Sequence, residues 1–257
     1  MKLIISSLIP ISLASFAEMD QLFQSILKNK TISNRAFGEN QFALSLEPVQ
    51  NYGCWCYSLK EHTNKGKSKP QDELDALCKK LAEGYECARI DAENEGLECS
   101  AWEEEYVGAD GRRQQCSELK TEEDVAGIPP EILANLGISV VSKCKKQACL
   151  IEQNFVEEVA DLFLDEFQSP IDPRQESLKH ENFDIEGTCI SKDCVGSFCS
   201  NDKQCCGEVP NRRTYKPVSE SGEDRKCCGN VVYLNAMHQC CESDGDLEVV
   251  PIGTCLV

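Results

Sequence analysis

Histidine is scarce in this chain: among its 257 residues there are only His62, His180 and His238. None of them lies at ligand spacing from a cysteine pair, which argues against zinc as the explanation for the cysteines discussed below. Histidine is also the side chain best suited to accept a proton near neutral pH. A reaction that needs a general base therefore has few candidates in this sequence.

Positive charge is also in short supply, since 26 Lys and Arg residues stand against 44 Asp and Glu residues and leave a net charge of −18. The acid is concentrated, because residues 86–105 hold eight carboxylates against Arg89 alone. Such a charge disfavours nucleic acid and anionic membranes as partners. The acidic charge is compatible with cations or basic proteins as partners, or with a surface that contacts only solvent.

Long apolar runs are lacking, with one exception. Lys2 is followed by "LIISSLIPISLASFA", which ends with the small residues Ser15 and Ala17 shortly before the polar Glu18. A basic start, a short apolar core and small residues before a polar one are typical of a secretory signal peptide. A membrane anchor is the alternative, but the run is too short to span a bilayer comfortably. We predict a signal peptide at 1–17 and a secreted, extracellular mature chain without a transmembrane segment.

Cysteine, by contrast, is abundant, with 18 residues, and in a chain that enters the secretory pathway this number predicts disulfide bonds. Eight cysteines lie between Cys54 and Cys149, and ten lie between Cys189 and Cys255. Two even sets separated by a cysteine-free interval predict two modules, each closed by its own disulfides. The predicted boundaries are 18–168 for the first module, 169–188 for a linker and 189–257 for the second module.

Apolar residues at helical spacing predict two long helices, over 71–90 and 143–167. In the first, the residues that recur at steps of three or four are Leu74, Leu77, Leu81 and Tyr85. In the second, apolar residues at helical spacing form one face. The carboxylates from Glu152 onward fall mostly on the other face.

Shorter helices are predicted within "EMDQLFQSILKNK", directly after the signal peptide, and within "GIPPEILANLG". The sequence Asn29-Lys30-Thr31 is a glycosylation sequon, which predicts that Asn29 is exposed. The second module has few apolar residues, so disulfides must supply the order that a core would give. The predicted fold class is mainly α and disulfide-rich, with a small irregular or β cystine-rich module at the C-terminal end.

The segment "YGCWC" and the later "GKSKPQDELDALCK" together resemble the calcium loop and first active-site helix of secreted phospholipase A2. The resemblance covers roughly residues 18–167. Ser68 stands where the family has a glycine, and an insertion separates the two segments. The residues that match are Tyr52, Gly53, Cys54, Trp55, Cys56, Gly66, Pro70, Asp72, Asp75 and Cys78.

This resemblance implies a phospholipase A2-like architecture with an antiparallel helix pair, a phospholipid surface as partner and a disulfide from Cys56 to Cys78. It also implies calcium as cofactor, because a cation held by loop carbonyls and a carboxylate can stabilise an oxyanion. In this sequence the candidate calcium ligands are the carbonyls of Trp55 and Tyr57 and the carboxylate of Glu83.

The family's catalytic His-Asp pair is missing. Counted without a gap from Asp75, the pair falls on Leu81 and Ala82; with one extra residue it falls on Ala82 and Glu83. Neither register supplies an imidazole, and loss of a general base removes about two to four orders of magnitude of rate. His62 lies in the inserted loop, and nothing in the sequence places it against the helix.

The second module has a resemblance of its own. Its segment "CCGNVVYLNAMHQCC" resembles the repeats of galaxin-like extracellular matrix proteins, and a related Cys-Cys-Gly occurs at 205–207. This implies a structural or adhesive role outside the cell. The residues that carry it are Cys227, Cys228, Gly229, Tyr233, Asn235, Cys240 and Cys241.

We therefore predict a secreted, acidic, phospholipase A2-like protein that is catalytically inactive. It would act as an extracellular matrix or binding protein associated with calcium, and its partner would be an extracellular protein or the matrix. The alternative that stays open is a calcium-dependent secreted phospholipase A2, which would hydrolyse the sn-2 ester of phospholipids.

Overall fold

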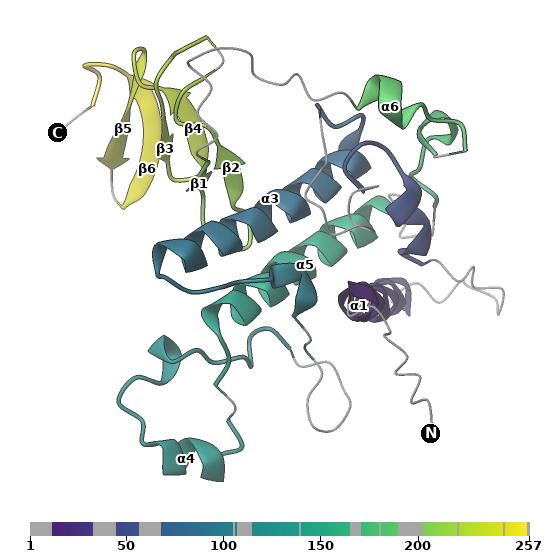
Figure 1. Cartoon of the computed structure of the whole chain (residues 1–257), viewed down its shortest axis with the longest axis vertical. Coiled ribbons are helices and arrows are strands. Elements are labelled where there is room, and N and C mark those ends of the chain that lie inside the picture. The colour runs from purple at the N-terminus through teal and green to yellow at the C-terminus, as the bar shows by residue number, and fades with distance from the viewer. Residues whose placement is uncertain are drawn as a thin grey trace, which may run out of the picture.

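A group of packed helices and a set of small β-hairpins make up the protein (Figure 1). The computed structural model describes residues 12–32, 45–56, 68–104, 106, 115–138, 140–164, 171–179, 181–189, 203–219, 221–243 and 245–255. The helices are α1 (Ser12–Ile32), α3 (Glu73–Asn94), α4 (Pro130–Asn135), α5 (Lys143–Leu162) and α6 (Ile185–Thr188). The strands are β1 (Gln204–Cys206), β2 (Arg213–Tyr215), β3 (Arg225–Cys228), β4 (Val231–Leu234), β5 (His238–Ser243) and β6 (Asp246–Pro251).

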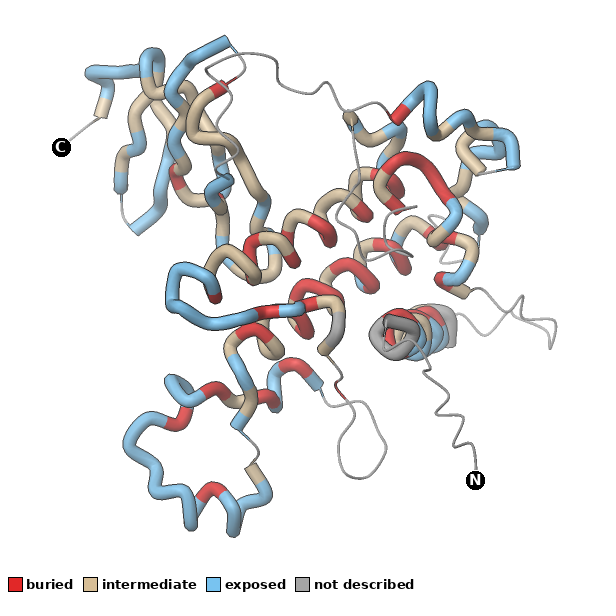
Figure 2. The backbone as a smooth tube through the Cα atoms, viewed as in Figure 1, coloured by how far each residue is buried: buried red, intermediate tan, exposed pale blue. Residues whose placement is uncertain are grey.

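Helices α3 and α5 run antiparallel, which confirms the predicted helix pair. Lys80 Nζ bonds Glu158 near one end of the pair at 2.6 Å, and Lys143 Nζ bonds Glu95 near the other end at 2.6 Å. The buried residues follow the facing sides of both helices (Figure 2). The predicted bounds 71–90 and 143–167 were partly wrong, because α3 runs from Glu73 to Asn94 and α5 ends at Leu162.

Helix α1 packs its apolar side against this pair, since Phe23 and Leu27 are buried. The ring of Phe23 meets the ring of Phe163 edge to face, with the ring centroids 5.3 Å apart. Helix α1 begins at Ser12, ahead of the predicted signal-peptide cleavage position, and the signal peptide itself stays a prediction. Asn29 of the sequon is exposed near the end of α1. None of the described helices combines the length and the apolarity needed to cross a bilayer.

The C-terminal part consists of three antiparallel two-stranded sheets, β1–β2, β3–β4 and β5–β6. This agrees with the predicted small cystine-rich module of irregular or β structure. The adjacent cysteines of this part lie on β1, β3 and β5, where neighbouring residues point to opposite faces of a strand. One cysteine of each adjacent pair can therefore bond an earlier element while the other bonds a later one.

The disulfides form a continuous series that follows from this alternation. Eight disulfides join all sixteen cysteines of the described part of the chain. The four in the series are Cys87–Cys205, Cys206–Cys227, Cys228–Cys240 and Cys241–Cys255. The other four are Cys54–Cys189, Cys56–Cys78, Cys99–Cys144 and Cys116–Cys149.

Two of these disulfides correct the prediction that each cysteine set closes on itself. Cys54–Cys189 and Cys87–Cys205 both join the first set to the second. The second of them fixes β1 to the middle of α3. The segment predicted as a linker also contacts the first module, because Gly53 N–H donates to the carbonyl oxygen of Leu178 at 3.1 Å.

Candidate functional site

The loop that carries "YGCWC" is held to α3 by a single buried carboxylate. Asp75 is fully buried, and its Oδ1 accepts the backbone N–H groups of Trp55 at 2.6 Å and Cys56 at 3.3 Å. Its Oδ2 accepts the N–H of Gln71 at 2.9 Å. The Cys56–Cys78 disulfide, the pair that the resemblance implied, joins the same loop to the same helix. Loop and helix therefore form one rigid junction.

Tyr52 extends this junction toward the segment at 171–179. Its hydroxyl donates to Asp72, the N-cap residue of α3, and accepts the backbone N–H of Gln175 at 3.1 Å. Burial and the neighbouring Asp72 raise the pKa of Tyr52 well above its usual range, so this hydroxyl stays protonated. Asp72 and Asp75, both matched to the family motif, thus serve to cap the helix and bind the loop.

The positions of the missing dyad lie on α3, one turn after Cys78. Leu81 is 1% exposed and belongs to the core, and Ala82 is 4% exposed. Glu83, the other candidate for the dyad, is half-buried and lies 3.8 Å from Lys79 Nζ. None of these side chains is an imidazole in either register. His62 and His180 lie outside the described residues.

One turn after Leu81 on α3, Tyr85 meets two other polar side chains inside the core. Tyr85 donates its hydroxyl to Glu152 Oε1 at 2.7 Å, and Tyr106 donates to the same oxygen at 3.2 Å. Glu152 is fully buried. The two hydroxyls stabilise a carboxylate oxygen that would otherwise be costly to bury.

Glu152 corrects the sequence analysis, which placed it with the polar face of its helix. The signal that could have found it is its spacing, because it lies four residues after Ala148 and three before Phe155, both of which are buried. A carboxylate in phase with an apolar stripe is a candidate for burial. Tyr85 lies on the predicted stripe of α3, but its hydroxyl partner could not be read from the pattern.

The predicted calcium ligands are only partly described. Trp55 is half-buried, with its Nε1 donating to the carbonyl of Ser68 at 3.2 Å and Lys79 Nζ lying 5.3 Å from its ring centroid. Tyr57 lies outside the described residues. Within the described ranges no three His, Cys, Asp or Glu side chains come together in a way that could hold a metal ion.

Glu83 has surroundings that disfavour a second role as a calcium ligand. Burial raises the pKa of its carboxyl, and the cations Lys79, Arg213 and Lys203 partly offset this rise. The carboxylate is thus already balanced by positive charge from both modules. A divalent cation would have to enter against those three side chains.

The acidic segment is likewise compensated by residues distant in sequence. Asp91 pairs with Arg212, and Lys203 lies 3.5 Å from Glu86. These pairs were invisible in the sequence, where Arg89 is the only nearby cation. They also hold the C-terminal hairpins against α3, beside the Cys87–Cys205 disulfide.

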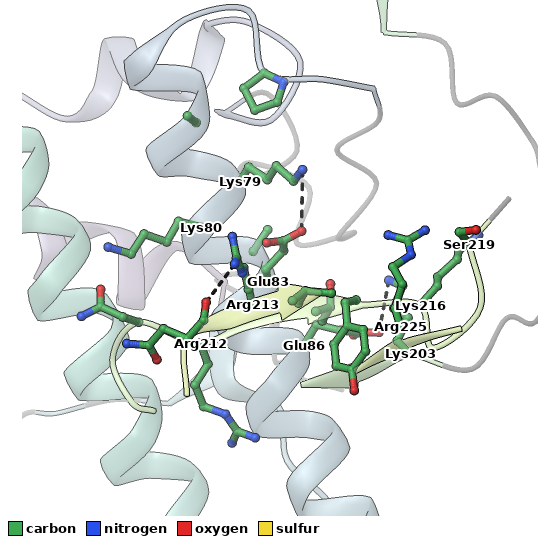
Figure 3. Close-up of a pocket in the computed structure, with 18 of the residues that line it drawn as sticks. Lys79, Lys80, Glu83, Glu86, Lys203, Arg212, Arg213, Lys216, Ser219 and Arg225 are labelled. Carbon is green, nitrogen blue, oxygen red and sulfur yellow. Dashed lines mark hydrogen bonds and ion pairs between the residues drawn. The ribbon is translucent and has the colours of Figure 1, made fainter. Parts of the chain in front are cut away.

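The docked hairpins and α3 border an open pocket of about 1120 Å³ (Figure 3). Trp55, Ala82 and Glu83, three of the predicted site residues, line one wall of it. The opposite wall comes from β2, β3 and β4 and the segments next to them. Leu81 does not line the pocket, and neither does His238 on β5.

Comparison with known proteins gives no relative for this chain. No family model matches it, and no curated protein or solved structure matches it either. The site must therefore be interpreted from its own residues.

Proposed function

We propose that the protein is a secreted, non-catalytic binding protein whose helical part has a phospholipase A2-like architecture and whose hairpins form a galaxin-like module. One observation carries the proposal. The two positions that the ungapped register assigns to the dyad are Leu81, inside the core, and Ala82, on the pocket wall. Hydrocarbon side chains can neither take a proton from water nor bind a cation.

The disulfides support the extracellular part of the proposal. Eight of them in the described residues are typical of a protein that folds in an oxidising compartment. The role in an extracellular matrix rests on the hairpin module, which is ordered by cystines and offers few buried apolar side chains of its own. Its partner would be an extracellular protein or the matrix.

The test is hydrolysis of micellar phospholipid by the purified full chain with added calcium, beside an active secreted phospholipase A2 as positive control. We expect no hydrolysis above the rate of buffer alone. Hydrolysis that depends on calcium and disappears with a chelator would overturn the proposal. In that event the variants His62→Ala, His180→Ala and His238→Ala would identify the base.

A calcium-dependent phospholipase A2 remains the second candidate because the loop is still bound to the helix by Asp75 and by Cys56–Cys78. Calcium association without hydrolysis is a separate part of the proposal, in which many weak sites on exposed carboxylates bind the ion. Calorimetric titration distinguishes the two, since an enzyme would bind one calcium ion per chain at a single site and the matrix protein would bind many ions at weak sites.

A further inference from the structure

The pocket between α3 and the hairpins is positively charged in a protein that is strongly negative overall. Among the described residues that line it, seven are Lys or Arg and three are Glu, whereas the whole chain carries a net charge of −18. Figure 3 shows these side chains gathered from the helix on one side and from the hairpins on the other. Charge of one sign in a concave space focuses the electrostatic field there.

Three of the seven cations hold the fold together. Lys80 pairs with Glu158 at 2.6 Å, Lys203 lies 3.5 Å from Glu86, and Arg212 pairs with Asp91. These carboxylates neutralise the three cations and connect α3 to α5 or to the hairpins. They leave little charge for a ligand.

The other four cations have fewer carboxylate partners, because Lys79 and Arg213 both offset the charge of the single carboxylate Glu83. Lys79 lies 3.8 Å from Glu83, and Arg213 donates from Nη2 to the neutral carbonyl of Asn230 at 2.8 Å. Lys216 and Arg225 form no ion pair with any residue that the structure describes. Arg225 Nε is buried and has no hydrogen-bond partner within the same residues.

These four side chains line one pocket from both walls, and Arg225 brings a buried Nε–H donor that has no acceptor among the described residues. Lys79 belongs to α3, Arg213 to β2, Arg225 to β3, and Lys216 follows directly after β2. Guanidinium groups bind tetrahedral oxyanions through paired N–H donors, and an ammonium group adds a point charge. Buried donors without partners cost free energy that such an anion would recover.

The net negative charge of the whole chain argues against a large anionic ligand. A long polyanion or an anionic membrane would bring further charge against the acidic remainder of the protein. A small anion can enter the pocket without bringing such further charge. We propose that the pocket binds a small ligand with a phosphate or sulfate monoester, whose oxygens are held by Lys79, Arg213, Lys216 and Arg225. This names a ligand class for the proposed binding protein and rests on that function.

The experiment is calorimetric titration of the full chain with inorganic phosphate and, separately, inorganic sulfate, with chloride at matched ionic strength as control. We expect saturable binding of at least one of the two oxyanions and none of chloride. Titration with a sugar phosphate and with the matching sugar sulfate then separates the two sources of the group. A rise in melting temperature with oxyanion concentration gives an independent readout.

The variants Arg225→Gln and Lys216→Gln should each weaken binding about tenfold or more, because each removes a charge-assisted contact. The matched control is Lys226→Gln, since Lys226 is exposed on β3 next to Arg225 and does not line the pocket. Glu83→Gln should tighten binding, because it removes a carboxylate from the pocket wall. Circular dichroism of each variant checks that the fold is retained.

Three results would overturn the proposal: no binding of either oxyanion, equal binding by the Arg225→Gln and Lys226→Gln variants, or binding only of a long sulfated polysaccharide or of anionic vesicles. These results test the anion site alone, because the proposed non-catalytic function is tested separately by the assay of phospholipid hydrolysis. Oxyanion binding without hydrolysis supports both proposals. If the protein both hydrolyses phospholipid and binds an oxyanion, the proposed non-catalytic function is wrong and the proposed oxyanion site is retained.

Discussion

Asp75 occupies the space that a side chain on Gly53 would need. A Cβ at Gly53 would lie 2.5 Å from Asp75 Oδ1, and the backbone of Gly53 has a φ of +53°. The glycine therefore lets the loop approach the carboxylate closely enough to donate from Trp55 at 2.6 Å. One small residue and one buried carboxylate together set the position of the loop on α3.

Replacing Gly53 by alanine should lower the free energy of unfolding by about 2–4 kcal/mol, from the left-handed backbone and the contact with Asp75 together. The matched control is Gly127→Ala, because Gly127 has a φ of +84° but nothing within 4 Å of its added Cβ. It should lose only about 1–2 kcal/mol from backbone strain. Denaturant unfolding without reductant measures both, and equal losses would contradict the close contact.

Asp75→Ala should lower the free energy of unfolding by about 3 kcal/mol or more, because three backbone N–H groups lose a charged acceptor. Glu73→Ala serves as control, since Glu73 is exposed in the same turn. Thermal unfolding compares the two variants with the unaltered protein. A loss no larger than that of Glu73→Ala would show that Asp75 does not hold the loop.

Ser68 has a φ of +75°, and it stands where the resemblance places a glycine. Ser68→Gly should therefore raise the free energy of unfolding by about 1 kcal/mol, because glycine adopts this backbone conformation without strain. Ser68→Ala removes the hydroxyl but keeps the strained conformation, so it should not stabilise the protein. If alanine stabilises as much as glycine, the hydroxyl and not the backbone is responsible.

From the raised pKa of the Glu83 carboxyl we predict that the stability of the folded protein depends on pH. Its pKa is raised in the folded protein, mainly by burial, so the folded state holds this proton more tightly than the unfolded state does. The contribution of this group to the free energy of unfolding is therefore fully present below its ordinary pKa of 4.5. It is lost as the pH rises through the raised pKa of the folded state.

Glu83→Gln should remove that loss, so the variant gains stability over the unaltered protein at neutral pH and not in the acid range. Denaturant unfolding at a series of pH values measures the difference. Glu73→Gln, an exposed change on the same helix, should show no such trend. A gain from Glu83→Gln that is equal at every pH would contradict the assigned cause.

The Cys87–Cys205 disulfide should hold the two parts of the chain together after the backbone is cut. With a protease site inserted after Ser191, the cleaved protein should run as one band on a non-reducing gel and as two after reduction. The double variant Cys87→Ser, Cys205→Ser should give two bands in both conditions. Two bands from the singly cut parent without reductant would show that this disulfide is not formed.

The helix pair could be predicted because its pattern is local. Apolar residues at steps of three and four identify the inner face of α3 within a few turns, without knowledge of its partner. The last turn of α3 was not predicted because its acidic residues continue no apolar stripe; in the folded protein Asp91 pairs with Arg212, and Glu95, just after the helix, pairs with Lys143. Charges that are neutralised by distant residues give no local signal.

The pocket could not be predicted for the same reason. Lys79 and Arg225 both line it, yet they belong to the two parts that cysteine spacing suggested were separate. Cysteine counts bound the number of disulfides but not their connectivity, so Cys87–Cys205 could not be read from the sequence. Without that bond nothing indicates that the hairpins dock on α3.

The series of disulfides from Cys255 back to Cys87 has a mechanical consequence. Tension applied at the C-terminal end would pass through four sulfur bridges and the three peptide links within the adjacent cysteine pairs. The hairpin loops between those bridges would carry none of it, and the strands need not unzip. The load would arrive in the middle of a packed helix, so this small module is built to resist pulling without a core of its own.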